Sequence, residues 1–359
     1  MIEVRPILIM AGGTGGHVFP ALAVADELRQ RGVPVVWLGT RAGIEARLVP
    51  EAGYPIEWMS ITGLRGKNAM TLLLAPARLL LACWQAMRVM LRVRPGAVLG
   101  MGGFASGPGG LVAWLMRKPL LIQEQNAVPG LTNKVLARLA GVVMQAFPGV
   151  FTGALTTGNP VRQAICDIED PRTRIQADDE PLRLLVIGGS LGAVKLNEII
   201  PRAIAKLEHD RRPEVVHQTG TKNIDEAKQC YAQAGVEADI KAFIDDMSAA
   251  YSWADLVICR SGAMTVFELA AAGVASVLVP YPFAVDDHQT ANARYLESAG
   301  AAIVRQQDEL SEDWVANTIE GFSSDRKRLV EMAVAARQLA IPNSARVIAD
   351  TCMCSGGLA

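Results

Sequence analysis

Residues 7–28 read ILIMAGGTGGHVFPALAVADEL, and residues 182–200 read LRLLVIGGSLGAVKLNEII. Each stretch contains a short apolar segment, a Gly-Gly pair with a hydroxyl residue, and an amphipathic segment, which predicts a strand, a loop and a helix. A helix that begins after a glycine-rich loop presents backbone N–H groups and the positive end of its dipole, so it suits a phosphate group. Because the pattern occurs twice, we expect two strand–loop–helix domains whose loops face a common cleft. Only the first copy carries a histidine, His17.

The rest of the chain repeats this alternation of apolar strands and amphipathic helices. In the first half we expect strands at residues 7–10, 35–38, 97–100, 120–123 and 141–144, and helices at 18–31, 44–52, 70–93, 106–116 and 131–140. In the second half we expect strands at residues 184–187, 214–218, 240–242, 256–259, 276–279 and 302–304. Such alternation predicts an α/β protein with two Rossmann-like, doubly wound parallel sheets.

The domain boundaries follow from polar and proline-containing stretches. Residues 159–181 are polar and carry Pro160, Pro171 and Pro181, so they are predicted to form the interdomain linker with a short helix inside it. Pro342 interrupts a long C-terminal helical pattern, and the segment after it is expected to return to the first domain. The predicted domains are therefore residues 1–163 with 343–359, and residues 164–342.

Composition and cysteine usage exclude several classes of protein. The 359 residues carry a formal net charge of −1, whereas nucleic-acid-binding proteins are usually basic. The six cysteines form no C-x-x-C pair, which indicates reduced thiols and no zinc site. The first predicted strand begins at Ile7, so we expect no signal peptide.

The glycine-rich loops match neither of the two common phosphate-binding fingerprints. After Gly16 the first loop continues with His17-Val18 instead of the Lys-Ser/Thr of a P-loop, and G-x-G-x-x-G does not fit its register. A third glycine-rich loop, GMGGFASGPGG, spans residues 100–110. Tight turns alone could explain any one of these loops, but three at equivalent strand ends favour a ligand site.

Two titratable residues stand out beside these loops. His17 lies in the first turn of its predicted helix, where the dipole disfavours imidazolium and keeps the ring able to accept a proton; a capping or packing role is the alternative. In RSGAMTVFELAAAG, residues 260–273, a helix is expected to start near Ala263 and to place Glu268 one turn inside, suited to two ribose hydroxyls. Gln289 and Asn292, which follow, suit sugar hydroxyls, and His288 is assigned no role.

The segment of residues 72–91 is apolar, but Pro76, Arg78, Gln85 and Arg88 interrupt it, so it is too polar to span a membrane. Leu73, Ala77, Leu80, Trp84, Met87 and Leu91 share a stripe that is expected to face the core. The opposite face places Leu74 and Leu81 beside Arg78 and Arg88. This second face is consistent with two interpretations. The segment is either an ordinary core helix with basic residues on its exposed side, or a helix that contacts an anionic phospholipid surface.

A series of motifs resembles one enzyme family. It comprises GGTGGHVFPALAVA (12–25), GMGGFASGPGG (100–110), QEQNAVPG (123–130), TGNPVR (157–162), GGSLGA (188–193), RSGAMTVFELAAAG (260–273) and DHQTANA (287–293). The series is similar to that of the lipid-linked N-acetylglucosaminyltransferases of glycosyltransferase family 28, in the GT-B superfamily. The resemblance implies a GT-B fold and inverting transfer of GlcNAc from UDP-GlcNAc to the C4 hydroxyl of N-acetylmuramic acid (MurNAc) in lipid I, which gives lipid II and UDP for peptidoglycan synthesis.

The resemblance also implies roles for individual residues. His17 would be the general base, and the acceptor diphosphate would bind at Gly13, Gly102, Gly103 and Ser106. The donor would bind at Thr14, Gly15, Gly16, Asn126, Arg162, Ser190, Ile244, Ala263, Met264, Thr265, Val266, Phe267, Glu268 and Gln289. Within that set, Ser190 and the helix from Ala263 would hold the diphosphate and Ile244 would bind uracil through its backbone.

Further expectations concern cofactors, partners and location. The sequence contains no D-x-D motif, which commonly holds the metal of metal-dependent sugar-nucleotide transferases, so we expect no essential metal and no other cofactor. The resemblance favours a peripheral enzyme on the cytoplasmic face of the bacterial inner membrane, with Leu74, Arg78, Leu81 and Arg88 in membrane contact, and with cell-wall and division proteins as partners. The alternatives are another GT-B glycolipid transferase, a UDP-sugar epimerase, or a UDP-sugar-binding protein without catalysis.

Overall fold

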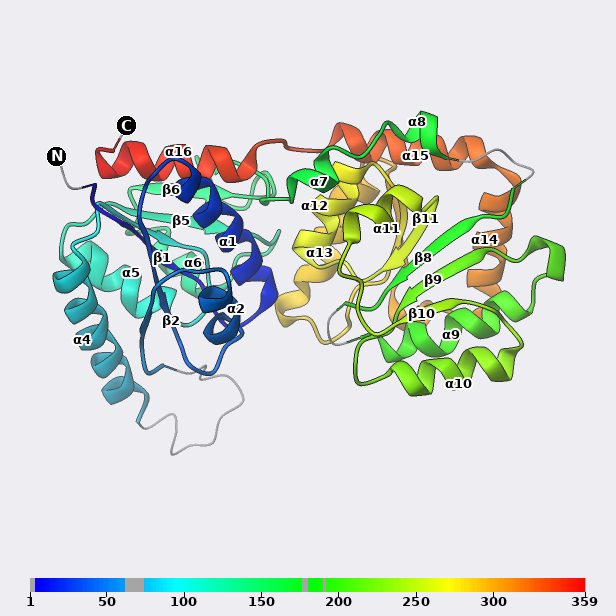
Figure 1. Ribbon diagram of the computed structural model, residues 1–359, viewed down its shortest axis with the longest axis horizontal. Helices are drawn as coiled ribbons and strands as arrows, with labels where there is room; N and C mark the ends of the chain where they lie inside the picture. Colours follow the sequence, from blue (N-terminus) through cyan, green and yellow to red (C-terminus); the bar gives the residue numbers. More distant parts are fainter. Residues whose placement is uncertain (1–3, 62–73, 176–179, 190–191, 359) are drawn as a thin grey trace. The chain divides into compact units, whose positions relative to one another are not determined.

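A computed structural model describes residues 4–61, 74–175, 180–189 and 192–358. The chain divides into two compact units, which are described separately (Figure 1). Unit 1 contains Met1–Val161 and Asn343–Ala359, and unit 2 contains Arg162–Pro342. The C-terminal segment therefore belongs to the same unit as the N-terminal half of the chain.

Unit 1 is built on a parallel sheet of seven strands in the order β3-β2-β1-β4-β5-β6-β7. Its strands are β1 (Ile7–Met10), β2 (Val35–Gly39), β3 (Ile56–Trp58), β4 (Ala97–Gly100), β5 (Leu120–Glu124), β6 (Val142–Gln145) and β7 (Leu155–Thr156). The central strand β1 is completely buried and pairs with β2 on one side and β4 on the other. The loops after β1, β4 and β5 consequently meet at one edge of this sheet.

Helices cover both faces of this sheet. They are α1 (Gly15–Gln30), α2 (Glu45–Glu51), α4 (Ala75–Val93), α5 (Ser106–Leu115), α6 (Leu131–Leu136) and α16 (Ser344–Gly356). Ile7 and Ile9 face α1 and α16, whereas Leu8 and Met10 face α4, α5 and α6. Helix α16 lies beside α1, and an ion pair between Arg31 and Asp350 joins them (Figure 1).

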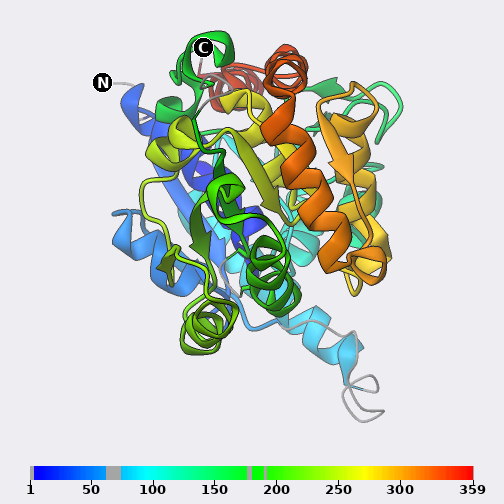
Figure 2. The same cartoon turned by 90° about the vertical axis from the view of Figure 1, so that its right-hand side faces the viewer.

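Unit 2 repeats the same strand order in a parallel sheet of six strands, β10-β9-β8-β11-β12-β13 (Figure 2). Its strands are β8 (Arg183–Ile187), β9 (Glu214–Gln218), β10 (Asp239–Lys241), β11 (Leu256–Cys259), β12 (Ala275–Leu278) and β13 (Ala302–Val304). Its helices are α7 (Gln163–Cys166), α8 (Pro171–Arg174), α9 (Val194–Ala205), α10 (Ile224–Ala234), α11 (Met247–Trp253), α12 (Ala263–Ala272), α13 (His288–Glu297), α14 (Glu312–Ser324) and α15 (Arg326–Gln338), with 3₁₀ turns η1 (His209–Arg211), η2 (Val285–Asp287) and η3 (Gln307–Glu309).

The predicted α/β class with two doubly wound parallel sheets is confirmed. The two short edge strands β3 and β7, of three and two residues, were not predicted. Helix α1 begins at Gly15 instead of Val18, since the N-terminal glycines adopt helical geometry in its first turn. Helix α6 ends at Leu136, four residues before the predicted end. Residues 70–73 of the predicted third helix lie outside the described residues.

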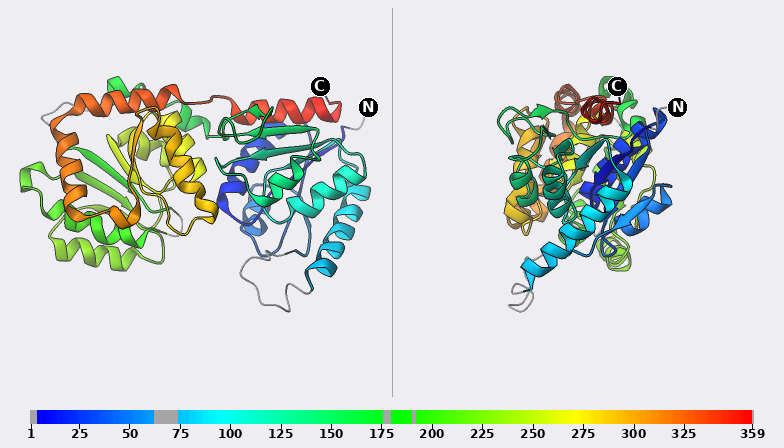
Figure 3. Two further views of the ribbon diagram at one scale, coloured as in Figure 1. Left: turned by 180° about the vertical axis from the view of Figure 1, so that it is seen from behind. Right: turned by 90° about the vertical axis from the view of Figure 1, so that its left-hand side faces the viewer.

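The prediction for the faces of α4 is wrong. The stripe expected to be in the core is exposed, with Leu80 at 71% and Leu91 at 58% of full exposure. The buried face contains Ala82, Ala86, Val89 and Met90 instead. Small alanine side chains let this helix approach the sheet and α5 closely, so the larger residues are left on the outside. The first turns of α4 extend away from the body of unit 1 (Figure 3).

Candidate functional site

The loop after β1 holds His17 in a defined orientation. Thr14 precedes α1 in an extended conformation, and His17 lies in the first turn of that helix, as predicted. The His17 Nδ1 atom is 3.3 Å from the Gly12 carbonyl oxygen and 3.4 Å from Thr14 Oγ1. A carbonyl oxygen only accepts hydrogen bonds, so this contact favours the tautomer with the proton on Nδ1 and the lone pair on Nε2. In this tautomer the nitrogen that can accept a proton is Nε2.

The loop after β4 packs directly against this histidine. Gly102 and Gly103 have φ angles of +93° and +84°, which L-residues with side chains rarely adopt. A Cβ atom on Gly102 would lie 2.8 Å from Nε2 of His17, and one on Gly103 would collide with the Gly12 carbonyl oxygen. These glycines allow the two loops to touch, which places His17 and both loops in one site of unit 1.

Two residues predicted to bind the acceptor diphosphate have their polar groups engaged within the protein. Ser106 is completely buried, and its Oγ is 2.9 Å from the Met10 carbonyl oxygen and 2.8 Å from that of Gly102. The prediction for the Ser106 side chain is therefore corrected to a brace between β1 and the second loop. The Gly13 amide donates to the buried Glu45 carboxylate at 2.9 Å, so this N–H is not available to a phosphate.

The loop after β5 is organised by Glu124, a buried residue that the sequence analysis did not select. Its Oε1 accepts a hydrogen bond of 2.9 Å from the Asn126 backbone N–H, and its Oε2 accepts from Gly130 N–H and Asn133 Nδ2. The predicted donor-site residue Asn126 is thereby held at the same sheet edge as His17. A glutamate at the end of a buried strand was the available signal for this role.

In unit 2 the N-terminus of α12 follows the buried strand β11, as the sequence predicts. Gly262 is its extended N-cap, and Ala263, Met264 and Thr265 form its first turn. The next two predicted donor-site residues, Val266 and Phe267, are buried in the core, and the Val266 N–H bonds to the Gly262 carbonyl oxygen. Their contribution is to position the helix, while the residues before them present the amide groups of the helix end.

Glu268 lies one turn into α12 and has two polar neighbours. The Tyr251 hydroxyl donates to Glu268 Oε2 at 3.1 Å, and Arg162 Nη2 is 3.7 Å from Oε1. Burial raises the pKa of the Glu268 carboxyl, and the charge of Arg162 and the Tyr251 hydrogen bond oppose that rise. Arg162 and Glu268 are thus brought together, although they are far apart in the sequence. Tyr251 was missed because nothing local distinguishes it from a core tyrosine.

The remaining predicted donor-site residues differ in burial and in hydrogen-bond partners. Gln289 Oε1 accepts from the Tyr281 backbone N–H at 2.9 Å, which leaves its amide group as a donor. Ile244 is buried three residues after the end of β10. Asn292 is completely buried and donates to the Ser261 carbonyl oxygen, so its predicted contact with sugar hydroxyls is wrong and it braces the loop before α12. Ser190 lies outside the described residues.

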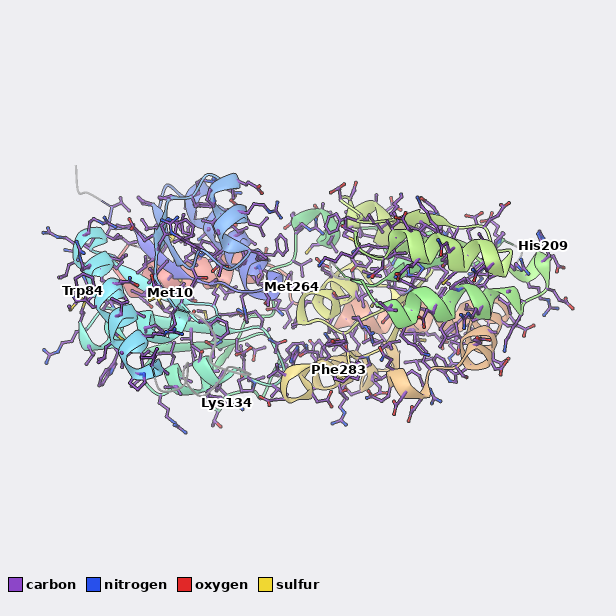
Figure 4. All side chains as sticks on the ribbon, turned by 90° about the horizontal axis from the view of Figure 1, so that it is seen from below. Met10, Trp84, Lys134, His209, Met264 and Phe283 are labelled. Carbon is purple, nitrogen blue, oxygen red and sulfur yellow. The ribbon has the colours of Figure 1, made fainter. Side chains whose placement is uncertain are left out.

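A large exposed apolar surface covers the outer side of helices α4, α5 and α6, which pack side by side. We call it the α4–α6 surface. Its exposed apolar residues are Leu74, Leu79, Leu80, Leu81, Trp84, Met87, Leu91, Trp114, Leu115, Leu131 and Val135. Exposed cationic residues lie among them, namely Arg78, Arg88, Arg94, Arg117, Lys134 and Arg138. Figure 4 shows Trp84 and Lys134 at the exterior of unit 1, whereas Met10 lies within the sheet. Contiguous patches of this kind mark interaction surfaces.

Two parallel α/β units with ligand loops at their strand ends define a GT-B glycosyltransferase. The crystal structure of MurG from Acinetobacter baumannii superimposes with a TM-score of 0.86 and 44% identity, over 97% of this chain and 99% of that chain. The calicheamicin glycosyltransferase CalG4, at 18% identity and a TM-score of 0.70 over 98% of each chain, shares the fold.

The chain belongs to glycosyltransferase family 28. The N-terminal domain of this family matches residues 7–145, and its C-terminal domain matches residues 183–350. A relative from Nitrosococcus oceani is 56% identical over 97% of this chain and 98% of its own length, and one from Alkalilimnicola ehrlichii is 54% identical over the same shares. Both are named UDP-N-acetylglucosamine–N-acetylmuramyl-(pentapeptide) pyrophosphoryl-undecaprenol N-acetylglucosamine transferase.

Proposed function

We propose that this enzyme transfers GlcNAc from UDP-GlcNAc to the C4 hydroxyl of MurNAc in lipid I, with inversion at C1, and releases lipid II and UDP. The observation that carries this proposal is the identity of 56% over 97% of the chain to an enzyme named for that transfer. The identity extends over both units. A different glycolipid transferase or an epimerase would be expected to differ in the loops of unit 1, so neither alternative is favoured.

Unit 2 is proposed to bind the donor. The amide groups at the start of α12 suit the diphosphate, because a helix N-terminus stabilises negative charge. Glu268 suits the ribose, since its ionised carboxylate accepts hydrogen bonds and its neighbours Arg162 and Tyr251 favour ionisation. Gln289 retains its amide group for the sugar hydroxyls. Ile244 and Ser190 complete the proposed donor site, at the uracil and at the diphosphate.

Unit 1 is proposed to bind the acceptor and to supply the base. As the C4 oxygen of MurNAc attacks C1 of GlcNAc, Nε2 of His17 takes the C4 proton and the bond from C1 to the UDP oxygen breaks, with its electron pair leaving on UDP. The Nδ1 contact with the Gly12 carbonyl oxygen supports this role, because it orients the lone pair of Nε2. Thr14, Gly15, Gly16 and Asn126 are proposed to complete the donor site from unit 1, and Gly102 and Gly103 to adjoin the acceptor diphosphate.

We propose that the transfer requires no metal ion. The sequence has no D-x-D motif. Among the described residues, no group of three or more His, Cys, Asp or Glu side chains is arranged to hold a metal. Charge on the leaving UDP would instead be stabilised by helix N-termini and by Arg162.

The α4–α6 surface is proposed to bind an anionic phospholipid membrane, where the lipid acceptor resides. Within the described residues, no helix is both long enough and apolar enough to span a bilayer. Leucine and tryptophan side chains can enter the interface while arginines contact anionic head groups. Arg88 stacks over the Trp84 ring at 4.8 Å, so an apolar and a cationic group are presented together. The predicted membrane contacts Leu74, Arg78, Leu81 and Arg88 belong to the α4–α6 surface.

The membrane proposal is tested by flotation with vesicles of defined composition. Replacing Leu80 and Trp84 with Ser should weaken binding to anionic vesicles by at least about tenfold, because each large apolar side chain contributes about 1.5–3 kcal/mol when buried. Val347→Ser on α16 is the matched control, since it is an exposed apolar residue on the opposite face of the sheet. Unchanged binding of the double variant would remove this surface from membrane contact.

We further propose that the enzyme resides at the cytoplasmic face of the inner membrane, with cell-wall and division proteins as partners.

The reaction is tested by measuring UDP release from UDP-GlcNAc with a lipid I analogue, with and without EDTA. The proposal expects release that depends on the acceptor and persists in EDTA. Release without acceptor would indicate hydrolysis, and no release despite tight UDP-GlcNAc binding would indicate a binding protein. Loss of acceptor-dependent release in EDTA, restored by a divalent cation, would contradict the metal-free mechanism alone.

A further inference from the structure

Glu45, the first residue of α2, carries a fully buried carboxylate with 0% exposure in unit 1. Its Oε2 accepts a hydrogen bond of 2.9 Å from the Gly13 backbone N–H. Its Oε1 accepts two from Thr40, one from the backbone N–H at 3.0 Å and one from Oγ1 at 2.7 Å. Among the residues that the structure describes, no cation pairs with it. Three hydrogen bonds from neutral donors therefore hold this buried charge.

The backbone around this carboxylate is shaped to admit it. A Cβ atom on Gly12 would lie 2.5 Å from Oε1, and one on Gly39 would lie 2.9 Å from Cγ. A Cβ atom on Gly43 would overlap the carboxylate as well. Glycines from the first loop, the end of β2 and the turn before α2 thus form a cradle for one side chain. At Gly12, the missing side chain makes room for Glu45.

The two glycines next to Glu45 in the β1 loop, Gly12 and Gly13, also lie close to the proposed general base. Gly13, which donates to Glu45, has a φ angle of +89° and directly precedes Thr14, the N-cap of α1. Gly12, on the other side of the contact, places its carbonyl oxygen against His17 Nδ1 and against Gly103. The Glu45 carboxylate is therefore linked, through the Gly12–Gly13 peptide, to the start of α1 and to the imidazole of His17.

We propose that Glu45 is a positioning residue of the acceptor half of the active site. Its buried carboxylate fixes the Gly12–Gly13 peptide so that the N-terminus of α1 and the His17 ring keep their orientation toward the acceptor. Glu45 itself does not touch substrate, because no part of it reaches the surface. The proposal rests on the proposed function for its kinetic readout, and on the geometry of the loop for its spectroscopic one.

The principal test is Glu45→Gln, which preserves shape but turns an NH₂ group toward one of two backbone donors. We expect kcat for UDP release with a lipid I analogue to fall about 10- to 100-fold, because a buried unpaired donor costs about 1–3 kcal/mol. The Kd for UDP, set by unit 2, should remain within about twofold. Thr40→Val removes one donor and keeps both backbone contacts, and should lower kcat by less than Glu45→Gln.

Glu51→Gln is the matched control, since Glu51 ends the same helix in an exposed ion pair with Arg47 and should leave kcat unchanged. The second readout is the NMR signal of the His17 imidazole, assigned by comparison with His17→Gln. Glu45→Gln should shift this signal and Glu51→Gln should not. If Glu45→Gln fails to fold, Glu45→Asp keeps the charge with a shorter reach, and a reduced kcat with unchanged UDP affinity is expected.

Normal kcat and an unshifted His17 signal in a folded Glu45→Gln protein would overturn the proposal. A rise in the Kd for UDP as large as the fall in kcat would also overturn it, because that result indicates general destabilisation. If wild-type protein shows no acceptor-dependent release, the proposed function fails. The His17 signal still decides whether Glu45 positions the loop.

Discussion

The glycine-rich loops after β1 and β8 occupy equivalent places in two sheets of the same strand order, yet the contacts of their described residues differ. The β1 loop is held by side chains: Glu45 accepts from Gly13, and Trp37 Nε1 donates to the Ala11 carbonyl oxygen at 2.8 Å. In the described part of the β8 loop, the contact is between backbone groups: Gly188 N–H donates to the Gln218 carbonyl oxygen at 3.0 Å. Around it, Asn197 and Asn223 both donate to the Thr219 carbonyl oxygen.

Strand register makes this contrast specific. Trp37 on β2 pairs with Ile9, and His217 on β9 pairs with Val186, each partner being the last but one residue of its strand. Trp37 Nε1 bonds to its loop, whereas His217 Nδ1 is 2.9 Å from the Tyr231 hydroxyl of α10. In the loop that carries the proposed catalytic side chain, buried side chains thus bond directly to the backbone of the loop. Orienting a reacting group requires more constraint than presenting backbone amides to a phosphate.

The largest expected effect tests whether the β1 loop carries the chemistry. His17→Ala should lower kcat by about 10²-fold or more, because a positioned general base contributes about 10²–10⁴-fold. UDP affinity should be unaffected, and His209→Ala, an exposed histidine in unit 2, serves as the control. The measurement is kcat for UDP release with the lipid I analogue. A near-normal kcat would assign the base role to another group or to solvent.

The complementary substitution in unit 2 should affect donor binding. Glu268→Gln should raise the KM for UDP-GlcNAc about 10- to 100-fold, since a hydrogen bond to a charged group is worth about 1.5–3 kcal/mol. The exposed Glu297→Gln on α13 is its control. Because burial raises the pKa of Glu268, wild-type KM should rise as the pH falls through that raised pKa, and the variant should lack this rise. An unchanged KM would remove Glu268 from the ribose site.

A pair of glycine substitutions separates loop strain from contact with His17. Gly102→Ala and Gly149→Ala both place a side chain at a positive φ angle, +93° and +83°, which costs about 1–2 kcal/mol. A Cβ atom on Gly102 meets His17, whereas one on Gly149 meets nothing within 4 Å. We expect about a tenfold lower kcat for Gly102→Ala only. Equal kcat values for the two folded variants would show that this contact has no catalytic consequence.

The last prediction concerns the buried His217 of unit 2, where the expected effect is on stability and the effect on turnover is the smallest. Burial lowers the pKa of His217 to about 3, so the folded protein keeps it neutral while the unfolded chain protonates near pH 6.5. The unfolded state then binds more protons, and unit 2 should lose about 2 kcal/mol of stability between pH 7 and pH 5. Urea unfolding at both pH values measures this loss. His217→Gln should reduce it, and an undiminished pH dependence would assign the loss to other groups.

Sequence patterns predicted the central parts of both units because those parts depend on local chemistry. Strands β1, β4 and β11 have the predicted bounds, since each is a short apolar run that ends at a glycine loop or tight turn. The start of α12 at Ala263 was likewise predicted from the turn before it. Contacts between distant residues could not be predicted. Tyr251 reaches Glu268 across 17 positions and Glu45 reaches Gly13 across 32.

The sequence by itself therefore determined the fold class, the glycine loops and the family motifs, because apolar periodicity and glycine placement act over a few neighbouring residues. Tertiary structure decided which side of α4 is buried, since close packing selected the small Ala82 and Ala86 over a longer apolar stripe. It also decided that Ser106 and Asn292 brace loops and that a buried glutamate holds the β1 loop. Such partners are set by strand register and helix packing, which bring together residues that no local pattern connects.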